Sequence, residues 1–106
     1  MALSQSALSA EYVAVDVRAR EAGAAVNPTA LTAQMAFVAP GTAPAGGDWH
    51  AAAWTTDTTT EPDSYQARCL VGPGGVVLAA GSYAVWLKIT DSPEVPVREV
   101  GRLTIT

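Results

Sequence analysis

The sequence predicts an all-β protein, a single-domain sandwich of two packed sheets with about seven strands. Hydrophobic and polar residues alternate with a period of two along most of the chain, which is the pattern of strands that bury one face. Clusters rich in glycine, proline and polar residues interrupt this alternation and separate about seven short strands. The chain has 106 residues, which suits one domain with a single modest core. A small β-barrel is the alternative arrangement of such strands.

The first two strands are expected at residues 12–20 and 31–38. In the first, valines alternate with charged residues, so the valines fall on the buried face: Val13, Val15 and Val17 against Asp16, Arg18 and Arg20. In the second, the inward set is Leu31, Ala33, Met35 and Phe37. The alanines of this segment and the helix-start signal at residues 27–29 are also compatible with a helix. We favour a strand because the flanking segments alternate so regularly.

Three further strands are expected between the polar loops that follow. Residues 49–56 form the third, with Trp49 and Trp54 on opposite faces because they are five residues apart. Residues 65–71 form the fourth, whose inward set is Tyr65, Ala67, Cys69 and Val71. A tight reversal over residues 72–75 then leads to a short fifth strand at residues 76–78.

The segment that follows narrows the prediction to an immunoglobulin-like sandwich. A leucine precedes Gly81-Ser-Tyr83, which enters a long alternating strand, and this is the pattern of the tyrosine corner of immunoglobulin-like domains. We expect the ring of Tyr83 to pack under the preceding turn, with its hydroxyl bonded to the backbone. The last strand is expected at residues 97–106, with a bulge at Gly101.

Composition and charge exclude several classes of function. The formal net charge is -4, which argues against nucleic acid as a partner and against attachment to an anionic membrane surface. No apolar run approaches the roughly 18 to 20 residues that span a bilayer. Cys69 and His50 are the only cysteine and the only histidine, so no internal disulfide or thiolate zinc cluster is possible. The first ten residues make a poor secretion signal, which predicts synthesis in a cytoplasm.

No motif in the chain predicts catalysis, a cofactor site or a metal site. The glycine-rich turn at residues 72–75 lacks the lysine and the hydroxyl residue of a phosphate-binding loop. The loop carboxylates Asp57, Glu61 and Asp63 have oxygen ligands that calcium prefers, but their spacing matches no known calcium loop. Paired carboxylates for glycoside hydrolysis need a deep cleft, which a sandwich of this size does not offer. We therefore predict a protein that binds and does not catalyse.

The candidate contact residues lie on the last two strands and at the N-terminus. Alternation places Trp86 outward beside Lys88, with Arg98 or Arg102 expected to flank it across the ladder. Outward tryptophans and arginines are enriched at interface cores. The alternative is that a loop of the same chain covers Trp86.

The N-terminal residues 1–10 are expected to form a flexible arm, and residues 11–106 the sandwich domain. Residues 1–10 have no charged side chain and too little apolar surface to fold alone. Leu3 and Leu8 suit docking on a neighbouring subunit. The alternative is a frayed tail without a role.

Four segments carry a resemblance to known proteins: residues 35–37, Gly47-Asp-Trp-His50-Ala-Ala-Ala-Trp54, Cys69-Leu-Val-Gly-Pro-Gly-Gly75, and Gly81-Ser-Tyr-Ala-Val-Trp-Leu-Lys-Ile-Thr through Pro96. They resemble small proteins encoded in the structural-gene modules of actinobacterial tailed phages. More loosely, they are similar to the immunoglobulin-like N-terminal domain of phage baseplate upper proteins. The likeness covers residues 11–106 and carries no catalytic residue.

The resemblance implies a virion structural protein, made in the host cytoplasm, that assembles in multiple copies. Its implied partners are other virion proteins and copies of itself, and its implied place is the head or the head–tail (neck) region. A tail or baseplate component is the alternative that the second likeness implies. A bacterial surface or carbohydrate-binding module is the competing class outside the virion.

Overall fold

The structure is a computed structural model that describes residues 2–17, 19–21, 24–26, 31–56, 65–90 and 95–106. The described residues are all-β, as predicted, and a short 3-10 turn, η2 (Gly46–Asp48), is the one helical element among them. The strands are β1 (Ala2–Gln5), β2 (Glu11–Val17), β3 (Ala19–Glu21), β4 (Ala24–Val26), β5 (Thr32–Val38), β6 (Trp49–Thr56), β7 (Tyr65–Val71), β8 (Gly81–Thr90) and β9 (Val97–Ile105).

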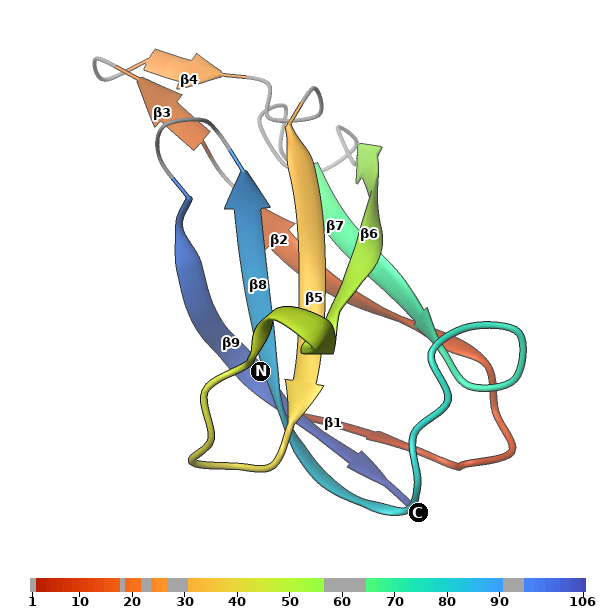
Figure 1. The fold of residues 1–106 in the computed structure, drawn as a ribbon. Coiled ribbons are helices and arrows are strands. Elements are labelled where there is room, and N and C mark those ends of the chain that lie inside the picture. The colour runs from red at the N-terminus through yellow and green to blue at the C-terminus, as the bar shows by residue number, and fades with distance from the viewer. Residues whose placement is uncertain (1, 18, 22–23, 27–30, 57–64, 91–94) are drawn as a thin grey trace.

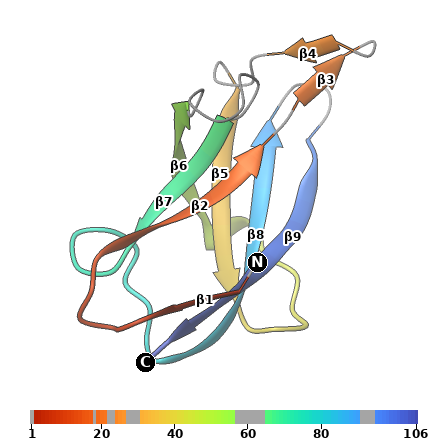
Figure 2. The ribbon, with the colours of Figure 1, turned by 180° about the vertical axis from the view of Figure 1, so that it is seen from behind.

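Seven strands form one sheet in the order β1-β9-β8-β5-β6-β7-β2, and β3 and β4 form a separate hairpin at one end (Figures 1 and 2). Strand β6 belongs to two layers. Its first half, Trp49 to Ala52, pairs with β5, whereas its second half, Ala53 to Thr56, pairs with β7. The sheet therefore folds back on itself at β6. The result is a two-layer sandwich that is closed along one side, as a barrel would be.

The strand order identifies the sandwich as immunoglobulin-like. One layer holds β2, β7 and β6, and the other holds β6, β5, β8 and β9, which is the B-E-D and C-F-G arrangement of immunoglobulin domains. The tyrosine corner is present at the start of β8, where the hydroxyl of Tyr83 donates a hydrogen bond of 2.7 Å to the carbonyl oxygen of Ala79. The ring packs against the core but stays half-buried. The predicted fold class is confirmed.

The core lies between the two layers and consists of the inward positions of five strands. The alternation predicted for the valine strand, for residues 33–37 and for residues 67–71 is confirmed. Val85 is fully buried two residues after Tyr83, at the position where antibody domains carry a disulfide cysteine. Cys69 is buried as well, and burial raises the pKa of its thiol. The largest fully buried side chains are Met35, Leu103, Val13, Val71 and Val85.

The predicted fifth strand at residues 76–78 is wrong. Only Val76 makes a β-bridge, to Val71. Two backbone hydrogen bonds curl the chain here: the amide of Gly72 donates to the carbonyl of Val76, and the amide of Val76 donates to the carbonyl of Leu70. These bonds prevent the segment from extending along a neighbouring strand.

The predicted flexible arm is also wrong for residues 2–5, which form strand β1. This strand pairs in parallel with β9, from Ala2 opposite Arg102 to Gln5 opposite Ile105. Gln5 is only 6% exposed, and its side-chain amide donates to the carbonyl oxygens of Ser9 (3.0 Å) and Val71 (2.8 Å). Backbone pairing needs no apolar side chains, so a segment with few of them still becomes part of the domain.

Candidate interaction surfaces

Trp86 lies on the outer face of the layer that holds β5, β8 and β9, as predicted. Its ladder neighbours are Ala36 on β5 and Glu99 on β9. Its side chain is half-buried, and its indole nitrogen Nε1 is buried with no hydrogen-bond partner among the described residues. The short turn η2 packs against β5, the neighbour of β8 in the sheet. Trp86 is therefore partly covered by its own chain, and offers a smaller contact surface than its outward position suggests.

The predicted ring of cationic side chains around Trp86 does not form. Arg98 pairs with Leu87 and therefore lies on the opposite face of the sheet from Trp86. Arg102 lies on the same face as Trp86, but its Nε donates to a carboxylate oxygen of Glu99 at 3.2 Å. The cause is a β-bulge at Val100, between Glu99 opposite Trp86 and Gly101 opposite Val85. The extra residue inverts the alternation along β9, so positions that a regular strand places together are separated.

Lys88 contacts a different tryptophan from the one predicted. Its Nζ lies 4.4 Å from the centroid of the Trp49 ring, in cation–π geometry. The two residues flank β5 on its outer face, because Lys88 is opposite Gln34 and Trp49 is opposite Ala36. The ammonium group therefore caps the Trp49 ring and removes it from the freely accessible aromatic surface.

Leu8 is the most exposed apolar residue of the candidate set, at 91%, and Leu3 on β1 is 39% exposed. A second apolar residue that sequence reasoning missed, Val77, is 77% exposed. Leu8 and Val77 lie on two loops at the same end of the sandwich, residues 6–10 and 72–80 (Figure 1). We call these two side chains the apolar tip. Val77 was not predicted as an exposed loop residue because residues 76–78 were assigned to a strand that pairs with its neighbours.

The two loops of the apolar tip are fastened to each other. The side-chain amide of Gln5 donates to the carbonyl oxygen of Ser9 in the first loop and to that of Val71, the last residue of β7, after which the second loop begins. Gly72 has a φ of +122° and approaches the backbone of Ser9 and Ala10 so closely that a side chain at this position would collide with them. The backbone of the loops that carry the apolar tip is therefore held in place by these contacts.

The outer face of the other layer carries an ordered group of polar residues that the sequence did not predict. The guanidinium of Arg68 on β7 stacks over the ring of Tyr12 on β2, 4.2 Å from its centroid. Beside it, the side-chain amide of Gln66 donates to a carboxylate oxygen of Asp16 at 3.0 Å. The sequence placed Arg68 and Asp16 outward, but alternation alone gives no cross-strand register and hence no partners.

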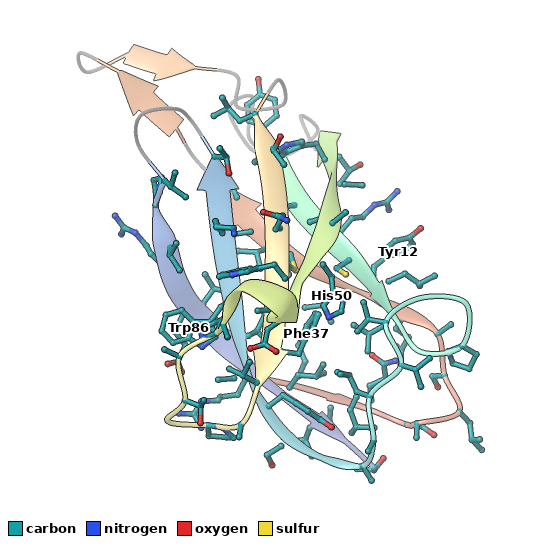
Figure 3. The ribbon with its side chains drawn as sticks, viewed as in Figure 1. Tyr12, Phe37, His50 and Trp86 are labelled. Atoms are coloured by element: carbon teal, nitrogen blue, oxygen red, sulfur yellow. The ribbon has the colours of Figure 1, made fainter. Side chains whose placement is uncertain are left out.

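Two chemically reactive side chains, Cys69 and His50, lie in the described part of the chain. Cys69 is buried, and its raised pKa keeps it a neutral thiol at physiological pH. The ring of His50 lies 6.4 Å from that of Phe37 (Figure 3). Among the described residues, no three histidine, cysteine, aspartate or glutamate side chains are grouped to hold a metal ion. The predicted loop carboxylates Asp57, Glu61 and Asp63 lie outside the described residues.

Comparisons with known proteins identify no relative: no family model, no curated protein and no solved structure matches the chain. No helix in the ranges that the structure describes has the length and apolar character to cross a membrane. Function is therefore inferred from the surfaces described above and from the resemblance noted in the sequence.

Proposed function

We propose that this chain is a non-enzymatic structural component of a tailed-phage virion, an immunoglobulin-like module that assembles in multiple copies at the head or neck. The observation that carries the proposal is the apolar tip, where Leu8 and Val77 are 91% and 77% exposed at the same end of the sandwich. Strongly exposed apolar side chains on neighbouring loops are candidates for a protein–protein contact site. The sequence resemblance supports the virion as the setting.

The construction of the apolar tip supports a binding role. Gln5 holds residues 6–10 to the end of β7, and Gly72 packs against Ser9 and Ala10, so little backbone entropy remains to be lost when a partner covers Leu8 and Val77. A small contact that repeats in every copy of an assembly is strengthened by multivalency. An exposed but rigid tip suits a module that is added to a symmetric particle.

The tryptophans argue against a carbohydrate-binding module, which needs flat aromatic rings open to solvent. Trp54 points toward the core, and its Nε1 donates to the carbonyl of Leu31 at 2.8 Å. Lys88 caps the ring of Trp49, and Trp86 is half-buried. Each of the three indoles therefore has its ring engaged by its own chain.

Particle incorporation tests the proposal. A tagged copy of the chain is expressed in the infected host, and purified particles are analysed for it by quantitative mass spectrometry. We expect a fixed ratio of the chain to the major capsid protein, and labelling of the tag in electron micrographs at the head or neck. Absence of the wild-type chain from purified particles would overturn the proposal. Labelling at the tail tip would assign the chain to the baseplate and not to the head or neck.

A matched pair of variants tests the apolar tip itself. Replacement of both Leu8 and Val77 by serine should lower incorporation by about fivefold or more, because it removes the apolar contact. Val95 is 48% exposed and precedes β9 at the other end of the sandwich, so Val95→Ser serves as the control. Equal incorporation of the double variant and the control would exclude the apolar tip as the contact.

A further inference from the structure

The outer face of the layer formed by β2, β7 and β6 is arranged in three rows that run across the strands. The upper row is Tyr12 and Leu70, the middle row is Ala14, Arg68 and Ala53, and the lower row is Asp16, Gln66 and Thr55. We call these eight positions the row face. In the middle row, the side chains on both sides of Arg68 are small, because both are alanines.

Charge on the row face is divided between its upper and lower rows. The Arg68 guanidinium leans over the Tyr12 ring, which places the positive charge above β2 in the upper row. The carboxylate of Asp16 lies on the same strand in the lower row, and one of its oxygens accepts the Gln66 amide. Residues two apart on a strand are separated by about 6.6 Å, so the two charges stand on either side of the middle row.

Arg68 also has unused hydrogen-bonding capacity. Within the described part of the chain, its buried Nε has no hydrogen-bond partner, and its guanidinium makes no hydrogen bond or ion pair with another residue. Tyr12, which supports the guanidinium, is 53% exposed. The guanidinium is therefore positioned by stacking while its donors lack a carboxylate acceptor.

We infer that the row face binds a second copy of this chain, about a two-fold axis that runs along the middle row. A half-turn about that axis places the upper row of one copy on the lower row of the other and keeps β2 opposite β2. The guanidinium of Arg68 then faces Asp16 of the second copy, and the symmetry repeats this pair on the other side of the axis. Tyr12 of the first copy packs against the lower row of the second copy, the row that contains Asp16.

Two properties of the face fit this arrangement. Ala14 and Ala53 lie on the axis, where each position meets its own symmetry mate, and small side chains there allow the two sheets to approach. The half-turn also makes the strands of the two copies antiparallel, which is compatible with the aligned packing of sheets at about 30°. A surface that complements itself under a two-fold axis is the requirement for a closed dimer.

Complementary charge is needed because the chain as a whole repels its own copies. The formal net charge is -4, so electrostatic attraction between two chains requires a positive group that meets a carboxylate. The two Arg68–Asp16 contacts meet this requirement. The inference concerns the isolated chain: absence of the chain from phage particles would leave it intact, and a monomeric chain found in particles would leave the proposed function intact.

Charge reversal tests the inference by sedimentation equilibrium of the full chain in low salt. We expect the wild type to dimerise, and Arg68→Asp and Asp16→Arg each to raise the dissociation constant by at least about tenfold. The double variant, which exchanges the two charges, should return to within about threefold of the wild type. Glu11→Arg, an exposed position on the other face of β2, is the control of equal charge change. A monomeric wild type, or a dimer that neither reversal weakens, would overturn the inference.

Cross-linking provides a second test that does not remove Arg68. Ala14→Cys places a thiol on the proposed axis, so a short bismaleimide should join two copies in high yield. Thr104→Cys, exposed on β9 in the other layer, should not be joined. The natural Cys69 is buried and stays unreactive in the folded chain. Equal cross-linking of the two cysteine variants would exclude the two-fold axis along the middle row.

Discussion

The Tyr83 hydroxyl donates to the carbonyl oxygen of Ala79 at 2.7 Å and so fastens the start of β8 to the loop that precedes it. The bond lies at the surface, where water competes for both groups. Its contribution to stability is therefore that of a single exposed hydrogen bond added to the packing of a half-buried ring.

Replacement of Tyr83 by phenylalanine should lower the free energy of unfolding by about 1 kcal/mol, because the hydrogen bond is lost and the ring is kept. Urea denaturation measures this difference. Tyr12→Phe is the matched control: the Tyr12 hydroxyl has no hydrogen bond among the described residues, so its loss should change stability by less than about 0.5 kcal/mol. Equal losses in the two variants would show that the tyrosine corner contributes nothing specific.

Gln5 joins the loop of residues 6–10 to the end of β7, so its truncation should be costly. Gln5→Ala leaves the carbonyls of Ser9 and Val71 without their side-chain donor in a buried position, which costs about 2 kcal/mol. Gln34→Ala, at a half-buried glutamine on β5, is the control and should cost less than half as much. Hydrogen exchange should also show faster exchange at residues 6–10 in the first variant only. A neutral Gln5→Ala would mean that β1 contributes little to the fold.

Gly72 should not tolerate a side chain. Its φ of +122° is unfavourable for other residues, and an added Cβ collides with the Ser9 oxygen. We expect Gly72→Ala to lower the unfolding free energy by about 3 kcal/mol. Gly74 also has a positive φ, of +87°, but open space around it, so Gly74→Ala should cost about 1 kcal/mol. A thermal melt distinguishes the two, and identical melting temperatures would contradict the close approach.

Trp86→Ala should act on stability more than on assembly. The indole is half-buried on the outer face of β8, so its removal should cost about 2 kcal/mol of unfolding free energy. Particle incorporation of the folded variant should match that of the wild type. Loss of incorporation with unchanged stability would instead restore Trp86 as a contact residue.

Cys69 makes stability depend on pH in the alkaline range. Burial raises the pKa of its thiol, so the unfolded chain loses this proton at a lower pH than the folded chain does. The contribution is fully present below the ordinary thiol pKa of about 8.5 and is lost as the pH rises above it. Between about pH 8 and pH 10 the wild type should therefore lose more stability than Cys69→Ala, as measured by urea denaturation. Parallel losses in the two proteins would contradict this.

Local patterns predicted most of the fold because the information lies within each strand. The valines of β2 and the alternation around Met35 and Cys69 mark buried faces without reference to any neighbour. The tyrosine corner is also local, because the Tyr83 hydroxyl bonds to Ala79, only four residues away. Features that depend on short-range spacing were therefore visible in the sequence.

The features that the sequence did not predict depend on contacts between distant residues. Strand β1 forms because Ala2 to Gln5 find backbone partners in β9, and backbone pairing leaves no hydrophobic pattern. The bulge was expected at Gly101, but Val100 is the extra residue, and that one position decides the face on which Arg98 lies. Arg68 and Tyr12 meet only through the register of β7 on β2.

The parallel pairing of β1 with β9 has a mechanical consequence. Tension applied to the chain before β1 and after β9 pulls two parallel strands in opposite directions along their common axis. The hydrogen bonds between them are then loaded in shear, all at once, and do not open one after another as in a peeled hairpin. A force spectroscopy experiment should accordingly find high resistance to pulling through the two ends. Residues 2–5, with few apolar side chains, would provide the clamp.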